Sequence, residues 1–169
     1  YPGEFSIYAA KNGADVIAVE PDPHNADELR ENIELNNLED KVDVVEKGLW
    51  NQKDTKKMER DVQFGLGSQI KDKGKLTIEL DTLDNICSGR DSVDLVKMDI
   101  EGAEMKALKG AKEIINESAP EFAIATYHVD EEGEKTCFEV EEILENMGYR
   151  TETGYKRHLT TYGEKNSDK

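Results

Sequence analysis

Short apolar runs of strand length alternate along this chain with segments that carry apolar residues at helical spacing. The apolar runs predict strands, and the three-to-four spacing predicts helices between them. Strands that alternate with helices over short connections favour a doubly wound α/β fold with a mostly parallel sheet covered on both faces. The predicted strands lie at residues 15–20, 41–48, 76–80, 93–100 and 121–128, and the predicted helices at 23–33, 104–115 and 136–147. A capping-box pattern from Thr136 to Glu139 opens the last helix.

The length of the chain, 169 residues, suits one domain with a substantial core. We predict a single domain over residues 1–163. Alternating residues near its end predict a terminal antiparallel pair at 149–163 around Gly154, and residues 164–169 are expected to fray.

The segment 93–104 ends an apolar strand in three acids and a glycine. Packing accounts for its apolar residues but not for Asp99, Glu101 and Glu104 crowded where the strand gives way to a helix. Acids in a first helical turn interact favourably with the helix dipole, and that is our interpretation of Glu104. Asp99 ends its strand at the edge where open α/β sheets bind ligands, so we predict a functional role for Asp99.

A second apolar strand, at 15–20, also ends in an acid, Glu20. A carboxylate at the end of the second strand of a nucleotide-binding unit can accept hydrogen bonds from both ribose hydroxyls, about 20 residues after a glycine turn. Gly3 precedes Glu20 by 17 positions (20 − 3). A merely solvated glutamate is the alternative. Asp22 is suited to N-cap the next helix, with Pro23 at its first position.

Two further strand ends carry candidate residues. Gly48 follows the strand at 41–48, where it either lets the backbone approach a flat ligand or forms a plain turn. His128 ends the strand at 121–128, and we predict that it is a catalytic base near Asp99 and Glu101, with a solvent-exposed loop histidine as the alternative. Asp99 and Glu101 could instead bind a divalent cation, but the sequence identifies no third ligand, so we predict no metal site.

Composition narrows the partners. Thirty-eight acidic against 22 basic residues give a net charge of −16, which disfavours nucleic acid or an anionic membrane as a partner. No apolar run reaches membrane-spanning length. We therefore expect a cytoplasmic protein that acts on a small-molecule or glycan acceptor, with self-association left open.

The segment 93–111, with its Lys97, Asp99, Glu101, Gly102 and Glu104, resembles the signature of FkbM-type methyltransferases. Residues 5–11 with 16–23 resemble the family's first helix and second strand, residues 80–84 resemble the segment before the signature, and the order is kept. The resemblance covers about residues 3–128. It implies transfer of a methyl group from S-adenosylmethionine, typically to a hydroxyl oxygen, by a seven-stranded Rossmann-like methyltransferase sheet. The residues implied to contact the cofactor are Gly3 in its turn, Glu20 at the ribose with Asp22 beside it, Gly48 and Leu49 at the adenine, and Asp99 near the methionine end.

One departure from the family concerns the beginning of the chain. The family opens with a strand and an acid-and-glycine turn, of which only Gly3 is present here after Tyr1. We therefore expect a fragment of a longer protein, or the product of a misplaced start, that lacks the first strand and binds the cofactor poorly alone. The competing functions are a nicotinamide dehydrogenase, which would also use Glu20, and a non-catalytic Rossmann-like binding or scaffold module.

Overall fold

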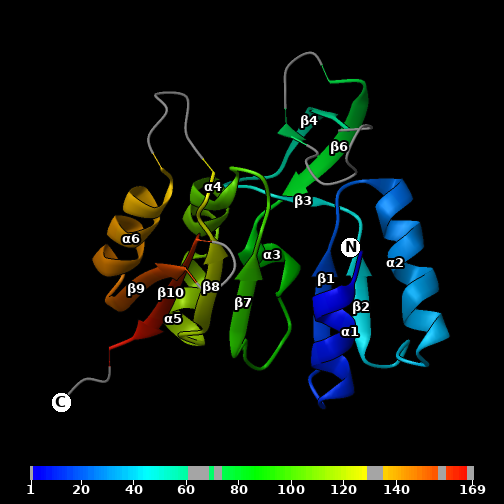
Figure 1. Cartoon of the computed structure of the whole chain (residues 1–169), viewed down its shortest axis with the longest axis horizontal. Helices are drawn as coiled ribbons and strands as arrows, with labels where there is room; N and C mark the ends of the chain where they lie inside the picture. The colour runs from blue at the N-terminus through cyan, green and yellow to red at the C-terminus, as the bar shows by residue number, and fades with distance from the viewer. Residues whose placement is uncertain (1, 61–68, 71–73, 129–134, 156–158, 167–169) are drawn as a thin grey trace. The chain divides into compact units, whose positions relative to one another are not determined.

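The computed structural model describes residues 2–60, 69–70, 74–128, 135–155 and 159–166 (Figure 1). The chain divides into two compact units, Tyr1–Asp81 and Thr82–Lys169, and each is described by itself. In the described part, no helix is both long enough and apolar enough to cross a membrane.

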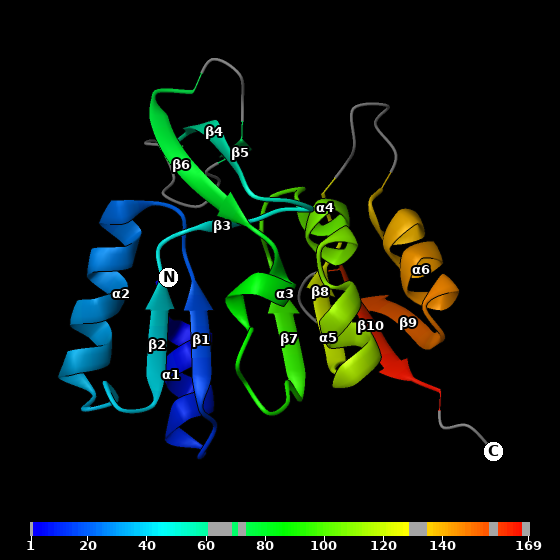
Figure 2. The ribbon, with the colours of Figure 1, turned by 180° about the vertical axis from the view of Figure 1, so that it is seen from behind.

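The first unit begins with a small α/β layer. Strands β1 (Val16–Val19) and β2 (Val42–Val45) pair in parallel, with Val16 opposite Val42 and Val19 opposite Val45. Helix α1 (Glu4–Lys11) covers one face of this pair in both views, and α2 (Pro23–Leu35) packs beside β2 (Figures 1 and 2). The predicted strand at 15–20 and helix at 23–33 are confirmed. Their apolar residues form one core, made by Ala10, Ala18, Leu29, Ile33, Leu38 and Val42.

A mixed sheet completes the first unit, in the order β3 (Gly48–Leu49), β6 (Leu76–Asp81), β4 (Asp54–Glu59), β5 (Gln69–Ile70). β3 is parallel to β6, whereas β4 is antiparallel to both of its neighbours. The predicted strand at 76–80 is confirmed. The prediction that one strand runs from 41 to 48 is wrong, because β2 ends at Val45 and Gly48 begins a strand of the other sheet.

The second unit contains the segment rich in acids. Its sheet has the order β7 (Leu95–Met98), β8 (Glu121–Ala125), β10 (Leu159–Lys165), β9 (Tyr149–Tyr155). β7 and β8 are parallel, with Met98 opposite Ile124, so their carboxyl ends meet at one edge. The helices of this unit are α3 (Leu83–Ile86), α4 (Glu104–Lys109), α5 (Lys112–Glu117) and α6 (Cys137–Asn146), and α6 packs on β9 and β10.

The α/β class is confirmed, but one mostly parallel seven-stranded sheet is not. The described strands form sheets of two, four and four strands, and two of these sheets are mixed. In the second unit β10 is antiparallel to both β8 and β9. The connection at 156–158 is far too short for a parallel crossover, so β9 and β10 can pair only as antiparallel neighbours. This pair confirms the predicted antiparallel arrangement, although Gly154 lies within the ladder opposite Thr160 and not at the turn.

Three local predictions are also corrected. Residues 104–115 form two helices, because α4 ends at a Gly110 C-cap and Asp84 accepts a hydrogen bond from the Ile114 amide of α5 at 3.0 Å. Thr136 precedes α6 but makes no side-chain cap; its hydroxyl lies 3.4 Å from the His128 carbonyl oxygen, to which it donates. The tail is ordered for longer than expected, because β10 continues through Lys165.

The core of the second unit is tightly packed around β8. Phe122 and Ile124 are almost fully buried, and the rings of Phe122 and Tyr149 meet edge to face at 5.4 Å. A Cβ atom at Gly163 would lie 3.0 Å from Leu144 Cδ1, so the glycine gives α6 a close approach to the sheet. The hydroxyls of Thr126, Thr153 and Thr161 form a buried threonine cluster, with oxygen distances of 3.1 and 2.6 Å. Thr126 directly follows β8, so the threonine cluster lies next to the edge at which β7 and β8 end.

Candidate functional site

A tight turn joins β7 to α4. The Ala103 amide donates to the Ile100 carbonyl at 3.3 Å, and the two central residues, Glu101 and Gly102, have φ values of 57° and 97°. Positive φ at both central positions is what a type I′ turn requires. Gly102 adopts this backbone conformation freely. For Glu101, which has a Cβ atom, the same conformation costs about 1 kcal/mol or more. A side chain kept at a strained position next to other titratable groups indicates a functional site.

Glu104, the first residue of α4, holds this turn from inside. Its side chain is fully buried, and Oε1 accepts a hydrogen bond from the Ile100 amide at 3.0 Å. Its other oxygen, Oε2, is buried and has no hydrogen-bond partner among the described residues. A buried carboxylate is costly unless it meets positive charge, so Glu104 does more than favour the helix dipole.

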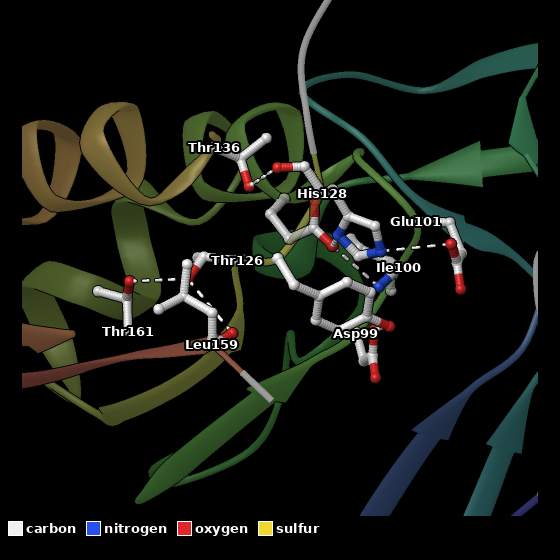
Figure 3. A network of polar contacts seen from close by, with 10 residues as sticks. Asp99, Ile100, Glu101, Thr126, His128, Thr136, Leu159 and Thr161 are labelled. Carbon is white, nitrogen blue, oxygen red and sulfur yellow. Dashed lines mark hydrogen bonds and ion pairs between the residues drawn. The ribbon is translucent and has the colours of Figure 1, made fainter. Parts of the chain in front are cut away.

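His128 lies between two carboxylates, those of Glu101 and Glu104, and Figure 3 shows Glu101 beside the ring. Its Nδ1 is 3.4 Å from Glu104 Oε1 and its Nε2 is 3.2 Å from Glu101 Oε2, and the side chain is 9% exposed. The Thr136 amide donates to the His128 carbonyl at 3.1 Å and fixes the backbone. The Glu104 carboxylate raises the pKa of His128, burial opposes this, and the charge of Glu101 raises it further. The imidazole therefore stays protonated to a higher pH than a free histidine.

Asp99 directly follows β7 and is exposed at the same edge. The Tyr127 hydroxyl donates to Asp99 Oδ1 at 2.9 Å, and the Tyr127 ring lies 4.2 Å from the His128 ring between centroids. Burial, then the hydrogen bond to Asp99, raises the pKa of Tyr127. Burial likewise raises the pKa of Glu101, against the opposing charge of His128. One ligand atom each from Asp99, Glu101 and His128 lies within 4.8 Å of the others.

The structure thus brings together the three residues predicted as catalytic. We call Asp99, Glu101 and His128 the edge cluster. The sequence reasoning missed two of its neighbours, Tyr127 and the full role of Glu104. Tyr127 precedes a predicted strand-end histidine, which is a usable signal, but nothing in the sequence showed that the Glu104 side chain turns inward.

In the first unit, Glu20 lies just beyond the carboxyl end of β1. Its Oε1 accepts a hydrogen bond from the Asp22 amide at 2.9 Å, and burial raises the pKa of Glu20 against that hydrogen bond. Asp22 is fully buried and N-caps α2, as predicted, with Oδ1 accepting from the His24 amide at 2.9 Å. Its carboxylate also pairs with Arg60, whose Nε lies 2.5 Å from Oδ2. These contacts give Asp22 a structural role.

The two glycines predicted at the cofactor have packing roles as well. Gly3 caps α1 with φ 86°, and a Cβ there would lie 2.3 Å from Leu29 Cδ1. A Cβ at Gly48 would lie 2.5 Å from Leu80 Cδ2, so the glycine leaves room for the Leu80 side chain of the same unit. Leu49 is 8% exposed. Gly3, Gly48 and Leu49 therefore have backbone groups, not side chains, to offer a ligand.

Comparison with known proteins places these features in context. A family model described as the Methyltransferase FkbM domain matches residues 2–151. The crystal structure of a methyltransferase FkbM from Methylobacillus flagellatus KT superposes with a TM-score of 0.68 and 23% sequence identity, covering 96% of this chain and 41% of that one. This chain therefore spans less than half the length of that relative. No curated protein matches the chain.

Proposed function

Because this chain belongs to the FkbM methyltransferase family, we propose that it serves in transfer of a methyl group from S-adenosylmethionine to a hydroxyl oxygen of a small-molecule, sugar or lipid-linked acceptor. The observation that carries the proposal is the edge cluster. Asp99, Glu101 and His128 gather at the carboxyl ends of two parallel strands, where open α/β sheets bind their ligands.

Glu20 has the chemistry to hold the cofactor. A carboxylate has about four lone-pair positions, and one oxygen of Glu20 already accepts from the Asp22 amide. The remaining positions suit the two ribose hydroxyls, at the strand end where nucleotide-binding units place such an acid. The carboxylate of Asp22 already accepts hydrogen bonds from the His24 amide and from Arg60, so we do not assign Asp22 to the cofactor. Gly3, Gly48 and Leu49 are proposed as backbone contacts, and Asp99 as a contact near the methionine end.

S-adenosylmethionine, when bound, supplies an electrophilic methyl group on a sulfonium. The residues of this chain would prepare the acceptor. His128 takes the hydroxyl proton, while Glu104 and Glu101 hold its ring from both sides and stabilise the imidazolium that forms. Asp99, held by Tyr127, orients the hydroxyl. Only the neutral form of His128 can act as the base. Since the pKa of His128 is raised, the rate should increase as pH rises through that raised pKa.

The test measures label transferred from methyl-labelled S-adenosylmethionine to hydroxyl-bearing acceptors: small molecules, sugars and lipid-linked sugars. The native protein that carries these residues is compared with its His128→Ala and Asp99→Asn variants. Loss of the base should lower the rate by about 10² to 10⁴. Glu121→Gln is the matched control, because it removes an exposed charge at the opposite end of β8.

Two results would count against the proposal. Cofactor binding without transfer to any acceptor class would favour the binding or scaffold module. If the His128→Ala variant has the parent's rate and pH profile, His128 is not the base. The proposed mechanism would then lack a proton acceptor.

A further inference from the structure

The surroundings of His128 pose a problem of charge. A neutral imidazole has one N–H donor and one lone pair. Here Nδ1 faces Glu104 at 3.4 Å and Nε2 faces Glu101 at 3.2 Å. A neutral ring can therefore offer a proton to one carboxylate only, and its other nitrogen directs a lone pair at the second. Either a second proton on the ring or a cation between Nε2 and the acids removes that repulsion.

We propose that the edge cluster, Asp99, Glu101 and His128, binds a divalent metal cation. The three donor atoms lie within 4.8 Å of one another, and His128 Nε2 lies 3.2 Å from Glu101 Oε2. Metal–ligand bonds of about 2.1–2.2 Å at right angles place neighbouring donors about 3.0 Å apart. The imidazole and Glu101 are thus already close to ligand spacing, and the ligand atom of the exposed Asp99 lies within 4.8 Å of both.

The burial of the histidine distinguishes this cluster from an ordinary group of surface acids. The His128 side chain is 9% exposed, and its ring nitrogens lie 3.2 and 3.4 Å from the Glu101 and Glu104 carboxylates, but among the described residues neither nitrogen has a hydrogen-bond partner in good geometry. A buried polar ring without such a partner is rare in a folded protein and calls for an ion or ligand. The ring is aimed at Glu101 and shares the sheet edge with Asp99 (Figure 3).

Glu104 supplies the support that metal-binding histidines usually have. Such a histidine donates its second N–H to a carboxylate, which fixes the ring and its tautomer. Glu104 Oε1 lies on the Nδ1 side of His128 and is itself held by the Ile100 amide at 3.0 Å. Tyr127 supports Asp99 in the same way, because it donates to one carboxylate oxygen and leaves the other to coordinate.

The donor set indicates which cation fits. Two carboxylate oxygens and one imidazole nitrogen suit Mn²⁺ and similar first-row ions, and three protein ligands leave positions open for water or substrate. This reading deepens the proposed function and rests on it for the role of the ion: an acceptor hydroxyl at an open position loses its proton more easily. In the cation-bound form His128 Nε2 is a ligand and cannot also accept a proton, so the cation takes over the activating role that the proposed function gives to His128, and the hydroxyl proton passes to solvent.

The experiment titrates the purified protein with Mn²⁺ alone, without S-adenosylmethionine, and follows the electron paramagnetic resonance signal of the free ion. The parent should bind one Mn²⁺, and nitrogen modulation in the pulsed spectrum should report the imidazole. Asp99→Asn and Glu101→Gln should each weaken binding at least about tenfold, since even residues that only support a ligand contribute about 10- to 100-fold. Glu104→Gln should weaken Mn²⁺ binding by about 10- to 100-fold, and His128→Ala should abolish the nitrogen modulation. Glu121→Gln should change neither the Mn²⁺ affinity nor the nitrogen modulation.

No Mn²⁺ binding by the folded parent would overturn the inference, as would binding that all four site variants leave intact. If His128→Ala does not fold, the two carboxylate variants carry the test, because Asp99 is exposed and Glu101 only partly buried. Mn²⁺ binding without methyl transfer would support the cation site and contradict only the proposed function. Methyl transfer that proceeds undiminished in chelator, without Mn²⁺ binding, would contradict only the cation site.

Discussion

Replacing Asp22 with alanine should destabilise the first unit by about 2.5 kcal/mol, from two separable losses. The first is the N-cap of α2, where Asp22 Oδ1 accepts from the His24 amide at 2.9 Å. The second is the ion pair with Arg60, which donates through Nε at 2.5 Å and through a second nitrogen to a carboxylate that is fully buried.

The magnitude follows from these two contacts. An N-cap of this kind contributes about 1 kcal/mol. Hydrogen bonds to a charged group contribute about 1.5–3 kcal/mol, and the Arg60 side chain is 43% exposed, so solvent screening selects the lower end of that range. Asp22→Asn keeps the cap, because asparagine caps as well as aspartate, and should therefore cost only about 1.5 kcal/mol.

The assay is urea unfolding followed by the fluorescence of Trp50, the single tryptophan of the chain, which packs in the first unit against the Met58 core. Asp27→Ala is the control, since its pair with Arg30 is exposed and should change stability by less than about 0.5 kcal/mol. An Asp22→Asn variant as stable as the parent would refute the assignment of stability to the Arg60 pair. Equal losses in the asparagine and alanine variants would refute the cap.

Three further outcomes are expected. Gly48→Ala should cost about 1–3 kcal/mol by urea unfolding, because its new Cβ would lie 2.5 Å from Leu80 Cδ2; an unchanged midpoint would contradict this. In chelating buffer, protonated His128 should stabilise the fold through its contact with Glu104. This stabilisation should be complete below the ordinary histidine pKa, about 6.5, and should be lost as pH rises through the raised pKa of His128. Melting temperatures that fall equally with pH in the parent and in His128→Gln would refute this prediction. Thr161→Val should cost about 1–3 kcal/mol, because it leaves the other hydroxyls of the buried threonine cluster without their shared partner; stability equal to the parent's would argue against that network.

The sequence predicted those parts of the fold that depend on local pattern. Asp22 and Pro23 marked the start of α2 because capping and proline preferences act within one turn. The edge cluster followed from one rule, that parallel strands deliver their carboxyl ends to a single edge, and the predicted proximity of Asp99 and His128 is confirmed.

The remainder depended on contacts or backbone conformations that the local sequence pattern does not contain. The break between α4 and α5 involves Asp84, 30 positions before the Ile114 amide that it accepts from, and no local pattern contains that contact. Thr136 matched a capping box, yet its hydroxyl donates to the His128 carbonyl oxygen, eight positions earlier, and makes no side-chain cap of α6. The inward-turned Glu104 follows Glu101, whose positive φ is a conformation found mainly at glycine. A contact outside the local pattern explains the first two cases, and an uncommon backbone conformation accompanies the third.

The most direct test of the account is calorimetric titration of S-adenosylmethionine into the native protein that carries this chain, comparing the parent with Glu20→Ala. We predict that the parent binds and that the variant, still folded, binds with about 1.5–3 kcal/mol less free energy, or roughly 10- to 150-fold more weakly, because it loses charge-assisted hydrogen bonds to the ribose. Glu34→Ala, an exposed acid on α2, should bind as the parent does. Absence of binding by the parent, or equal affinity in Glu20→Ala, would contradict the proposed cofactor site.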